Sequence, residues 1–166
     1  WIINRSSRDK QLLFFLVYTL NRKIKIGKIM DSVIAVVGIG YVGLQNAIAI
    51  AKAGLTVIAF DIDSDRICDL QKGIDRNHES VDLSNPNLTF TDNPNQLIKA
   101  DYYLVSVPTP INEHLVPNIF PLKNASRMVG DALSVGNVVI LESTVFPGAT
   151  RELMIPVLEQ QSGLKS

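Results

Sequence analysis

The stretch VIAVVGIGYVGL at residues 33–44 decides the fold. Its first part, Val33–Gly38, is a continuous and largely β-branched apolar run, typical of a central parallel strand buried on both faces. The glycines that follow have the spacing G-x-G-x-x-G, and small and apolar side chains suited to a closely packed helix continue over residues 42–53. The sequence therefore predicts a strand, a tight glycine turn and a helix.

Each glycine of this turn has a physical reason. Gly38 permits the tight turn, Gly40 lets a pyrophosphate approach the backbone, and Gly43 lets the helix pack against the strand. The start of the helix offers backbone N–H groups and a partial positive charge. We expect a dinucleotide phosphate to bind here.

An acidic residue supports this interpretation. Asp61 follows a second apolar run, Thr56–Phe60, close to the spacing of about 20 residues expected after the glycine turn. A carboxylate there accepts hydrogen bonds from the adenosine ribose and repels a 2′-phosphate, which favours NAD over NADP. The alternative is a glycine-rich turn with an incidental acid.

The rest of the body alternates between helical and strand patterns. We expect Ile67 and Leu70 to face inward from the first of the later helices. The alternation predicts an α/β fold of the Rossmann type, a doubly wound parallel sheet with strand order 3-2-1-4-5. The later elements are expected at residues 64–72 (helix), 88–91 (strand), 94–100 (helix), 102–107 (strand), 122–134 (helix), 138–141 (strand) and 149–160 (helix).

Charge and cysteine content limit the function classes. The chain has no formal net charge, but basic residues predominate in residues 1–30 and acidic residues in residues 31–166. The body therefore offers no basic surface to a nucleic acid. A single cysteine, Cys68, excludes an internal disulfide and favours a cytoplasmic protein; we expect it to be a small core residue. We find no metal-ligand cluster in the sequence.

The two ends differ from the body. Residues 1–29 precede Met30, and we interpret them as an extension or non-native leader, with a helix on a membrane surface as the alternative. Their apolar run, residues 12–20, is too short to span a bilayer. We expect residues 30–166 to form an incomplete Rossmann domain that lacks the substrate domain.

Several motifs in order narrow the choice. GIGYVGL (38–44), VPTPI (107–111) and ESTVFPGAT (142–150), with KGIDR (72–76) and PVLEQQSGL (156–164), resemble the UDP-glucose/GDP-mannose dehydrogenase family. Within it they look most like enzymes that oxidise UDP-N-acetylhexosamines to uronic acids for bacterial surface polysaccharides. The resemblance covers nearly all of residues 31–166.

The resemblance implies a set of NAD contacts. Val42 would meet the pyrophosphate and Arg66 the adenosine end, while Thr109 and Thr144 would line the nicotinamide side. The alternatives are a solvated helix face for Arg66 and capping of the local backbone by the threonine hydroxyls. The complete set of cofactor-binding candidates is Gly38, Gly40, Tyr41, Val42, Gly43, Asp61, Arg66, Pro108, Thr109 and Thr144.

The resemblance also implies the chemistry. Family members oxidise the C6 alcohol of a UDP-sugar to a carboxylate with two NAD molecules and a catalytic cysteine thiolate. We expect that cysteine and the UDP-sugar site in a missing C-terminal half, no catalytic residue in this chain, and a parent that is a homodimer or larger homo-oligomer. Alternatives are a 3-hydroxyacid or 6-phosphogluconate type dehydrogenase domain, and a non-catalytic NAD-binding remnant.

Overall fold

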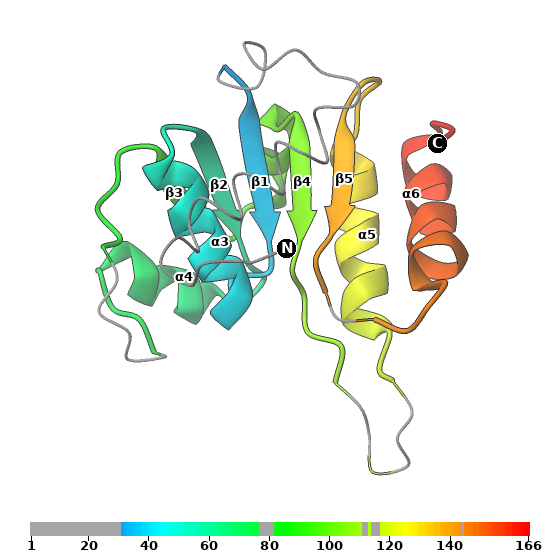
Figure 1. Cartoon of the computed structure of the whole chain (residues 1–166), viewed down its shortest axis with the longest axis horizontal. Coiled ribbons are helices and arrows are strands. Elements are labelled where there is room, and N and C mark those ends of the chain that lie inside the picture. Colours follow the sequence, from blue (N-terminus) through cyan, green and yellow to red (C-terminus); the bar gives the residue numbers. More distant parts are fainter. Residues whose placement is uncertain (1–30, 77–81, 111–112, 114–116, 144) are drawn as a thin grey trace, which may run out of the picture.

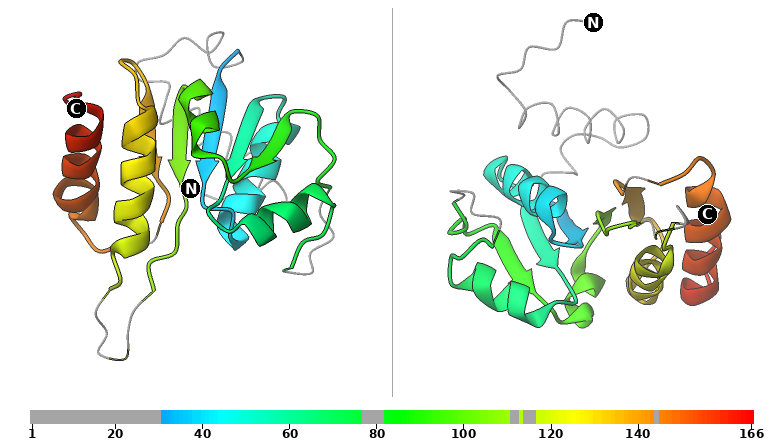
Figure 2. Two further views of the ribbon diagram at one scale, coloured as in Figure 1. Left: turned by 180° about the vertical axis from the view of Figure 1, so that it is seen from behind. Right: turned by 90° about the horizontal axis from the view of Figure 1, so that it is seen from below.

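A five-stranded parallel sheet forms the centre of the chain in the order β3-β2-β1-β4-β5 (Figure 1). The computed structural model describes residues 31–76, 82–110, 113, 117–143 and 145–166. The leader expected at residues 1–29 therefore lies outside the described residues. Helices cover both faces: α3 lies in front of the sheet in Figure 1, and α5 lies in front when the molecule is seen from behind (Figure 2). The predicted doubly wound topology is confirmed.

The element bounds follow the predicted alternation closely. No helix within the described ranges is long and apolar enough to cross a bilayer. The strands are β1 (Val33–Val37), β2 (Thr56–Phe60), β3 (Leu88–Thr91), β4 (Tyr102–Val105) and β5 (Val138–Leu141). The helices are α3 (Tyr41–Lys52), α4 (Ser64–Gln71), the 3₁₀-helix η1 (Pro94–Lys99), α5 (Phe120–Ala132), the π-helical turn η2 (Thr150–Met154) and α6 (Ile155–Ser162).

The fourth strand ends earlier than predicted. It stops at Val105 instead of Val107, because its neighbour β1 turns away at Gly38 and offers no further partner. The last ladder bond joins the Ser106 amide to the Val37 carbonyl at 2.8 Å. The chain beyond it is therefore released toward the carboxyl edge of the sheet.

Two apolar layers sandwich the sheet, and β1 contributes to both. Ile34 and Val36 pack with side chains from α3 and α4, whereas Ala35 and Val37 pack with side chains from α5 and α6. All four residues are at most 1% exposed. Burial on both faces explains why this strand reads as a continuous apolar run, without the polar alternation of a strand with one wet face.

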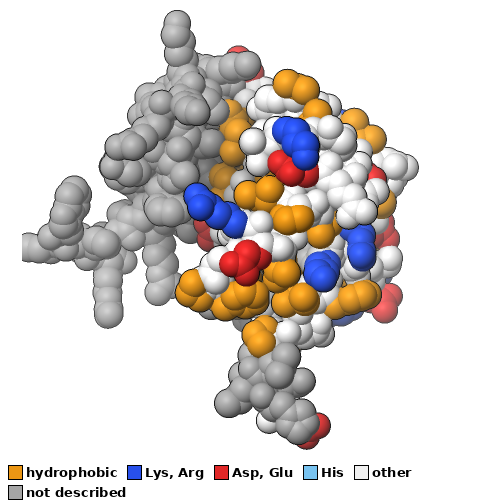
Figure 3. Space-filling view, turned by 90° about the vertical axis from the view of Figure 1, so that its right-hand side faces the viewer, with side chains coloured by type: hydrophobic (Ala, Val, Ile, Leu, Met, Phe, Trp, Pro, Cys, Tyr) orange, Lys and Arg blue, Asp and Glu red, His pale blue; other side chains and the backbone are white. Residues whose placement is uncertain are grey.

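The sheet is less well covered at its β5 edge. All four residues of β5 are half-buried, whereas those of β4 are buried. An apolar groove of about 440 Å³ separates α6 from the end of α5 and β5, and apolar side chains gather on this side of the molecule (Figure 3). Leu133, Val139, Ile155 and Leu158 contribute to its walls.

The expectation for Cys68 was wrong. Helix α4 buries Ile67 and Leu70, as predicted, but turns Cys68 outward to the solvent. Residues three apart share one face of a helix, and the residue that follows Ile67 is rotated away from that face. Cys68 is therefore not a small core residue.

Tyr103 connects the sheet to the 3₁₀-helix η1 and to the C-terminal end of α5. Its side chain is completely buried, and its hydroxyl lies 2.9 Å from the Leu97 carbonyl and 3.2 Å from the Ala132 carbonyl. Burial, aided by the nearby Asp101 carboxylate, raises the pKa of Tyr103 to about 12, so the hydroxyl keeps its proton.

We expect Tyr103→Phe to lower the free energy of unfolding by about 1–2 kcal/mol, because it removes the donor and leaves buried carbonyls unpaired. Urea unfolding measures this; an unchanged midpoint would contradict it.

Candidate functional site at the carboxyl edge of the sheet

The turn after β1 can only be made with glycine at two of its positions. Gly38 has φ = +94°, and its amide donates to the Phe60 carbonyl at 2.8 Å. A Cβ on Gly38 would lie 2.9 Å from the Ser106 carbonyl oxygen. A Cβ on Gly43 would overlap the Gly38 carbonyl oxygen. These two glycines therefore close the turn and bring α3 against β1, as the motif predicted.

Gly40 has a different role because it faces open space. Apart from Gly40 itself and its two neighbours in the chain, no described residue has a heavy atom within 4 Å of a Cβ built on Gly40. Gly40 is the N-cap of α3, where no side chain of the described residues caps the helix and the first turn holds no acid. The N-terminal end of the helix and its partial positive charge therefore face this open space. Tyr41 and Val42 flank it and are more than half exposed. A diphosphate fits this cradle.

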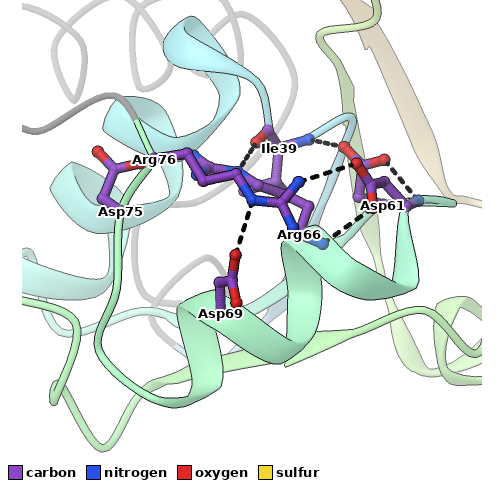
Figure 4. Close-up of polar contacts among 7 residues, drawn as sticks. Ile39, Asp61, Arg66, Asp69, Asp75 and Arg76 are labelled. Atoms are coloured by element: carbon purple, nitrogen blue, oxygen red, sulfur yellow. Dashed lines mark hydrogen bonds and ion pairs between the residues drawn. The ribbon is translucent and has the colours of Figure 1, made fainter.

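Asp61 is bonded directly to the glycine turn (Figure 4). At the end of β2, its Oδ2 accepts a hydrogen bond from the Ile39 amide at 2.6 Å, and its Oδ1 accepts one from the Asp63 amide at 3.0 Å. Each carboxylate oxygen can accept a second hydrogen bond. Asp61 is thus oriented by the protein and retains the capacity to accept ribose hydroxyls.

Arg66 is buried beside the same turn, so its interpretation as part of a solvated helix face was wrong. The residue is 7% exposed, and its Nε donates to the Ile39 carbonyl at 3.3 Å. Its Nη2 forms an ion pair with Asp75 Oδ1 at 2.7 Å. Its Nη1 is also buried and has no hydrogen-bond partner in the described part of the chain. Helix α4 begins at the carboxyl edge with Asp63 as its N-cap, which brings Arg66 to the turn.

The segments that follow β4 and β5 meet at the predicted nicotinamide side. The Ser143 hydroxyl donates to the Val107 carbonyl at 2.7 Å and so joins ESTV to VPTP. Thr109 lines an apolar pocket of about 270 Å³ with Ile119 and Val145, while Pro108 is exposed. Thr144 lies outside the described residues. Burial raises the pKa of Glu142 at the end of β5 above its usual value.

Two contributions to this site could not be recognised in the sequence. The backbone of Ile39 is held on both sides, since its amide donates to Asp61 and its carbonyl accepts from Arg66. Asp75 lies in KGIDR, which marked a family resemblance and gave no sign of a contact with Arg66. Neither feature has a local sequence signal, because both depend on how α4 and the following segment pack.

Comparison with known proteins shows the family of the chain. Residues 32–166 match the NAD binding domain of the UDP-glucose/GDP-mannose dehydrogenase family. The UDP-N-acetyl-D-glucosamine 6-dehydrogenase of Pseudomonas aeruginosa is 47% identical over 138 residues, which cover 81% of this chain and 32% of that protein. Protein CapL of Staphylococcus aureus is 45% identical over 137 residues, with coverage of 81% and 32%.

A solved structure shows the same relationship. The UDP-D-ManNAc dehydrogenase of Pyrococcus horikoshii superposes with a TM-score of 0.76 at 34% identity, over 81% of this chain and 33% of that one. This chain spans about a third of the length of the curated relatives that it matches. The match decides against the 3-hydroxyacid and 6-phosphogluconate alternatives. The open cradle at Gly40, the Asp61 carboxylate hydrogen-bonded to the same turn and the family match lead to one conclusion: the chain belongs to the UDP-glucose/GDP-mannose dehydrogenase family, and its body is that family's NAD-binding domain.

Proposed function

We propose that residues 30–166 are the NAD-binding portion of a dehydrogenase that oxidises the C6 alcohol of a UDP-N-acetylhexosamine to a uronic acid. The observation that carries this proposal is the open cradle at Gly40 with Asp61 bonded to the same turn. The names of the similar proteins support the substrate class, since they include dehydrogenases of UDP-N-acetyl-D-glucosamine and UDP-N-acetyl-D-mannosamine.

Each part of the edge would hold one part of the cofactor. The backbone from Gly38 to Gly43 and the start of α3 would bind the diphosphate, with Tyr41 and Val42 on its flank. Asp61 would accept hydrogen bonds from the adenosine ribose hydroxyls, and Arg66 would lie beside the adenosine end of the cofactor. The nicotinamide side would be contacted by Pro108, Thr109 and Thr144. These residues follow the carboxyl ends of strands, which is where ligands bind in open α/β sheets. NAD accepts hydride when bound, and the residues of this chain bind and orient it.

The remaining chemistry would belong to the rest of the parent protein. The parent would use two NAD molecules and a catalytic cysteine, bind the UDP-sugar through its other half, and assemble as a homodimer or larger homo-oligomer in the cytoplasm. Cys68 does not fit the catalytic role, because it lies on α4 beside the adenosine end of the site. A non-catalytic remnant that binds NAD is the second candidate.

We expect the 166-residue chain to bind NAD but to form no NADH from NAD and UDP-N-acetylglucosamine. The reason is that the described residues place no thiol near the nicotinamide side. Absorbance of NADH measures turnover, and calorimetry on the same sample shows whether NAD binds. The full-length relative from Pseudomonas aeruginosa is the positive control. Sustained NADH formation by the chain alone would contradict the proposal.

A further inference from the structure

The strongest unassigned feature is the buried ion pair between Arg66 and Asp75. Their side chains are 8% and 3% exposed, and Arg66 Nη2 lies 2.7 Å from Asp75 Oδ1. Removing two charges from water is costly, so a buried pair adds little net stability by itself. The main effect of the pair is therefore expected to be on the position of the Arg66 side chain and not on the free energy of unfolding.

The pair is connected to Asp61 through the backbone of a single residue, Ile39. Asp75 holds the Arg66 guanidinium, and Arg66 Nε donates to the Ile39 carbonyl at 3.3 Å. The Ile39 amide donates to Asp61 at 2.6 Å, and the Ile39 side chain is fully buried (Figure 4). Asp75, Arg66, Ile39 and Asp61 thus form one continuous chain of contacts.

Charge at this place bears on the choice of cofactor. A nearby arginine is the group that accommodates the 2′-phosphate of NADP in Rossmann domains. Here the guanidinium is held on a carbonyl of the turn, and its charge is offset by Asp75. With Asp61 beside it, the ribose position has a net negative charge, which repels a 2′-phosphate.

We propose that Asp75 is a positioning and specificity-determining residue for the adenosine end of the cofactor. It keeps the Arg66 guanidinium hydrogen-bonded to the Ile39 carbonyl, which fixes the glycine turn. It also prevents the guanidinium from binding a 2′-phosphate. This inference rests on the proposed binding of NAD at the carboxyl edge. It adds to Asp61 a second acid that selects NAD, acting through Arg66.

The neighbouring residue supplies a matched control. Arg76 forms an ion pair with Asp69 at 2.7 Å, but these side chains are 45% and 29% exposed and do not bond to the glycine turn in the described structure. Exposed pairs of this kind contribute little. Asp69→Asn therefore makes the same chemical change and the same change in net charge as Asp75→Asn, without touching Ile39.

In the test, NAD and NADP are titrated separately into the 166-residue chain and its variants, and calorimetry measures the affinity for each nucleotide. Asp75→Asn is expected to weaken NAD binding roughly tenfold, the equivalent of losing one hydrogen bond to a charged group. It is also expected to narrow the preference for NAD over NADP several-fold, because the released guanidinium can pair with the 2′-phosphate. Asp69→Asn is expected to change neither quantity. If Asp75 served folding alone, Asp75→Asn would lower the affinities for NAD and NADP by the same factor and leave the ratio of the two affinities unchanged.

A double variant covers the case in which Asp75→Asn does not fold. Arg66→Gln with Asp75→Asn removes both charges and leaves no unpaired ion. It is expected to bind NAD more weakly than the unaltered chain without a gain for NADP, since no guanidinium remains. NAD binding at the unaltered level in the double variant, or an unchanged nucleotide ratio in a folded Asp75→Asn, would overturn the role of Asp75. Failure of the unaltered chain to bind NAD would instead contradict the proposed function, and this inference with it.

Discussion

Gly43→Ala is expected to destabilise the chain by about 3 kcal/mol or more, at the upper end of the range for overpacked sites. A Cβ at this position would overlap the Gly38 carbonyl oxygen and would lie 3.3 Å from the Ser106 Cβ. The obstruction is mainly backbone, which cannot move without opening the turn or displacing α3 from β1. Urea unfolding followed by circular dichroism measures the loss, and a midpoint equal to that of the unaltered chain would contradict this account of Gly43.

Gly40→Ala separates binding from folding in the same turn. A Cβ at Gly40 meets no heavy atom within 4 Å from any described residue other than its chain neighbours, and φ of −74° suits any residue. Because alanine is a poorer N-cap than glycine, we expect stability to fall by no more than about 1 kcal/mol. The added methyl group enters the space proposed for the diphosphate, so NAD affinity should fall roughly tenfold or more, about 1.4 kcal/mol of binding free energy. Undiminished NAD binding in this variant would place the diphosphate elsewhere.

Asp61→Ala is expected to have the largest effect on cofactor binding. The change removes the acceptor for the ribose hydroxyls and also the acceptor of the Ile39 amide at 2.6 Å. Two hydrogen bonds to a charged group correspond to roughly a hundredfold loss of NAD affinity. Calorimetric titration with NAD measures it, on a sample whose fold is checked by circular dichroism.

Asp61→Asn is the matched control for shape. One amide oxygen can still accept from the Ile39 backbone, but the charge and one of the two acceptor atoms are lost. We expect an intermediate loss of NAD affinity and a smaller preference for NAD over NADP. If Asp61→Ala and Asp61→Asn both bind NAD as tightly as the unaltered chain, Asp61 is not the ribose acid.

Strands were predictable where a β-branched run is bounded by turn residues. The bounds of β2, β3 and β5 agree with the prediction, because such runs carry their own end signals. The end of β4 depends on where its neighbour β1 turns away, which the sequence of β4 does not record. Cys68 was wrongly assigned to the core from its residue type alone, although it follows Ile67 and so lies off the face that Ile67 and Leu70 bury.

The candidate site divides in the same way. The glycine turn and Asp61 follow from a local strand–turn–helix pattern, and the structure places them within hydrogen-bond distance of each other. Arg66 was predicted as a cofactor contact or a solvated residue, and the structure buries it against Ile39 and Asp75. That arrangement depends on how the chain returns across α4 after Gln71, which no local pattern encodes. The cofactor-binding roles of Asp61, Arg66, Thr109 and Thr144 stay predictions.

Titration of the ¹⁵N-labelled chain with NAD, followed by its amide resonances, tests most directly whether the cofactor lies across the carboxyl edge of the sheet. The account predicts saturable shifts that are largest for the amides of Ile39, Gly40, Tyr41 and Val42 and for Asp61, with smaller shifts at Thr109. Shifts confined to the opposite edge of the sheet, or an unchanged spectrum from a folded chain at high NAD concentration, would contradict it.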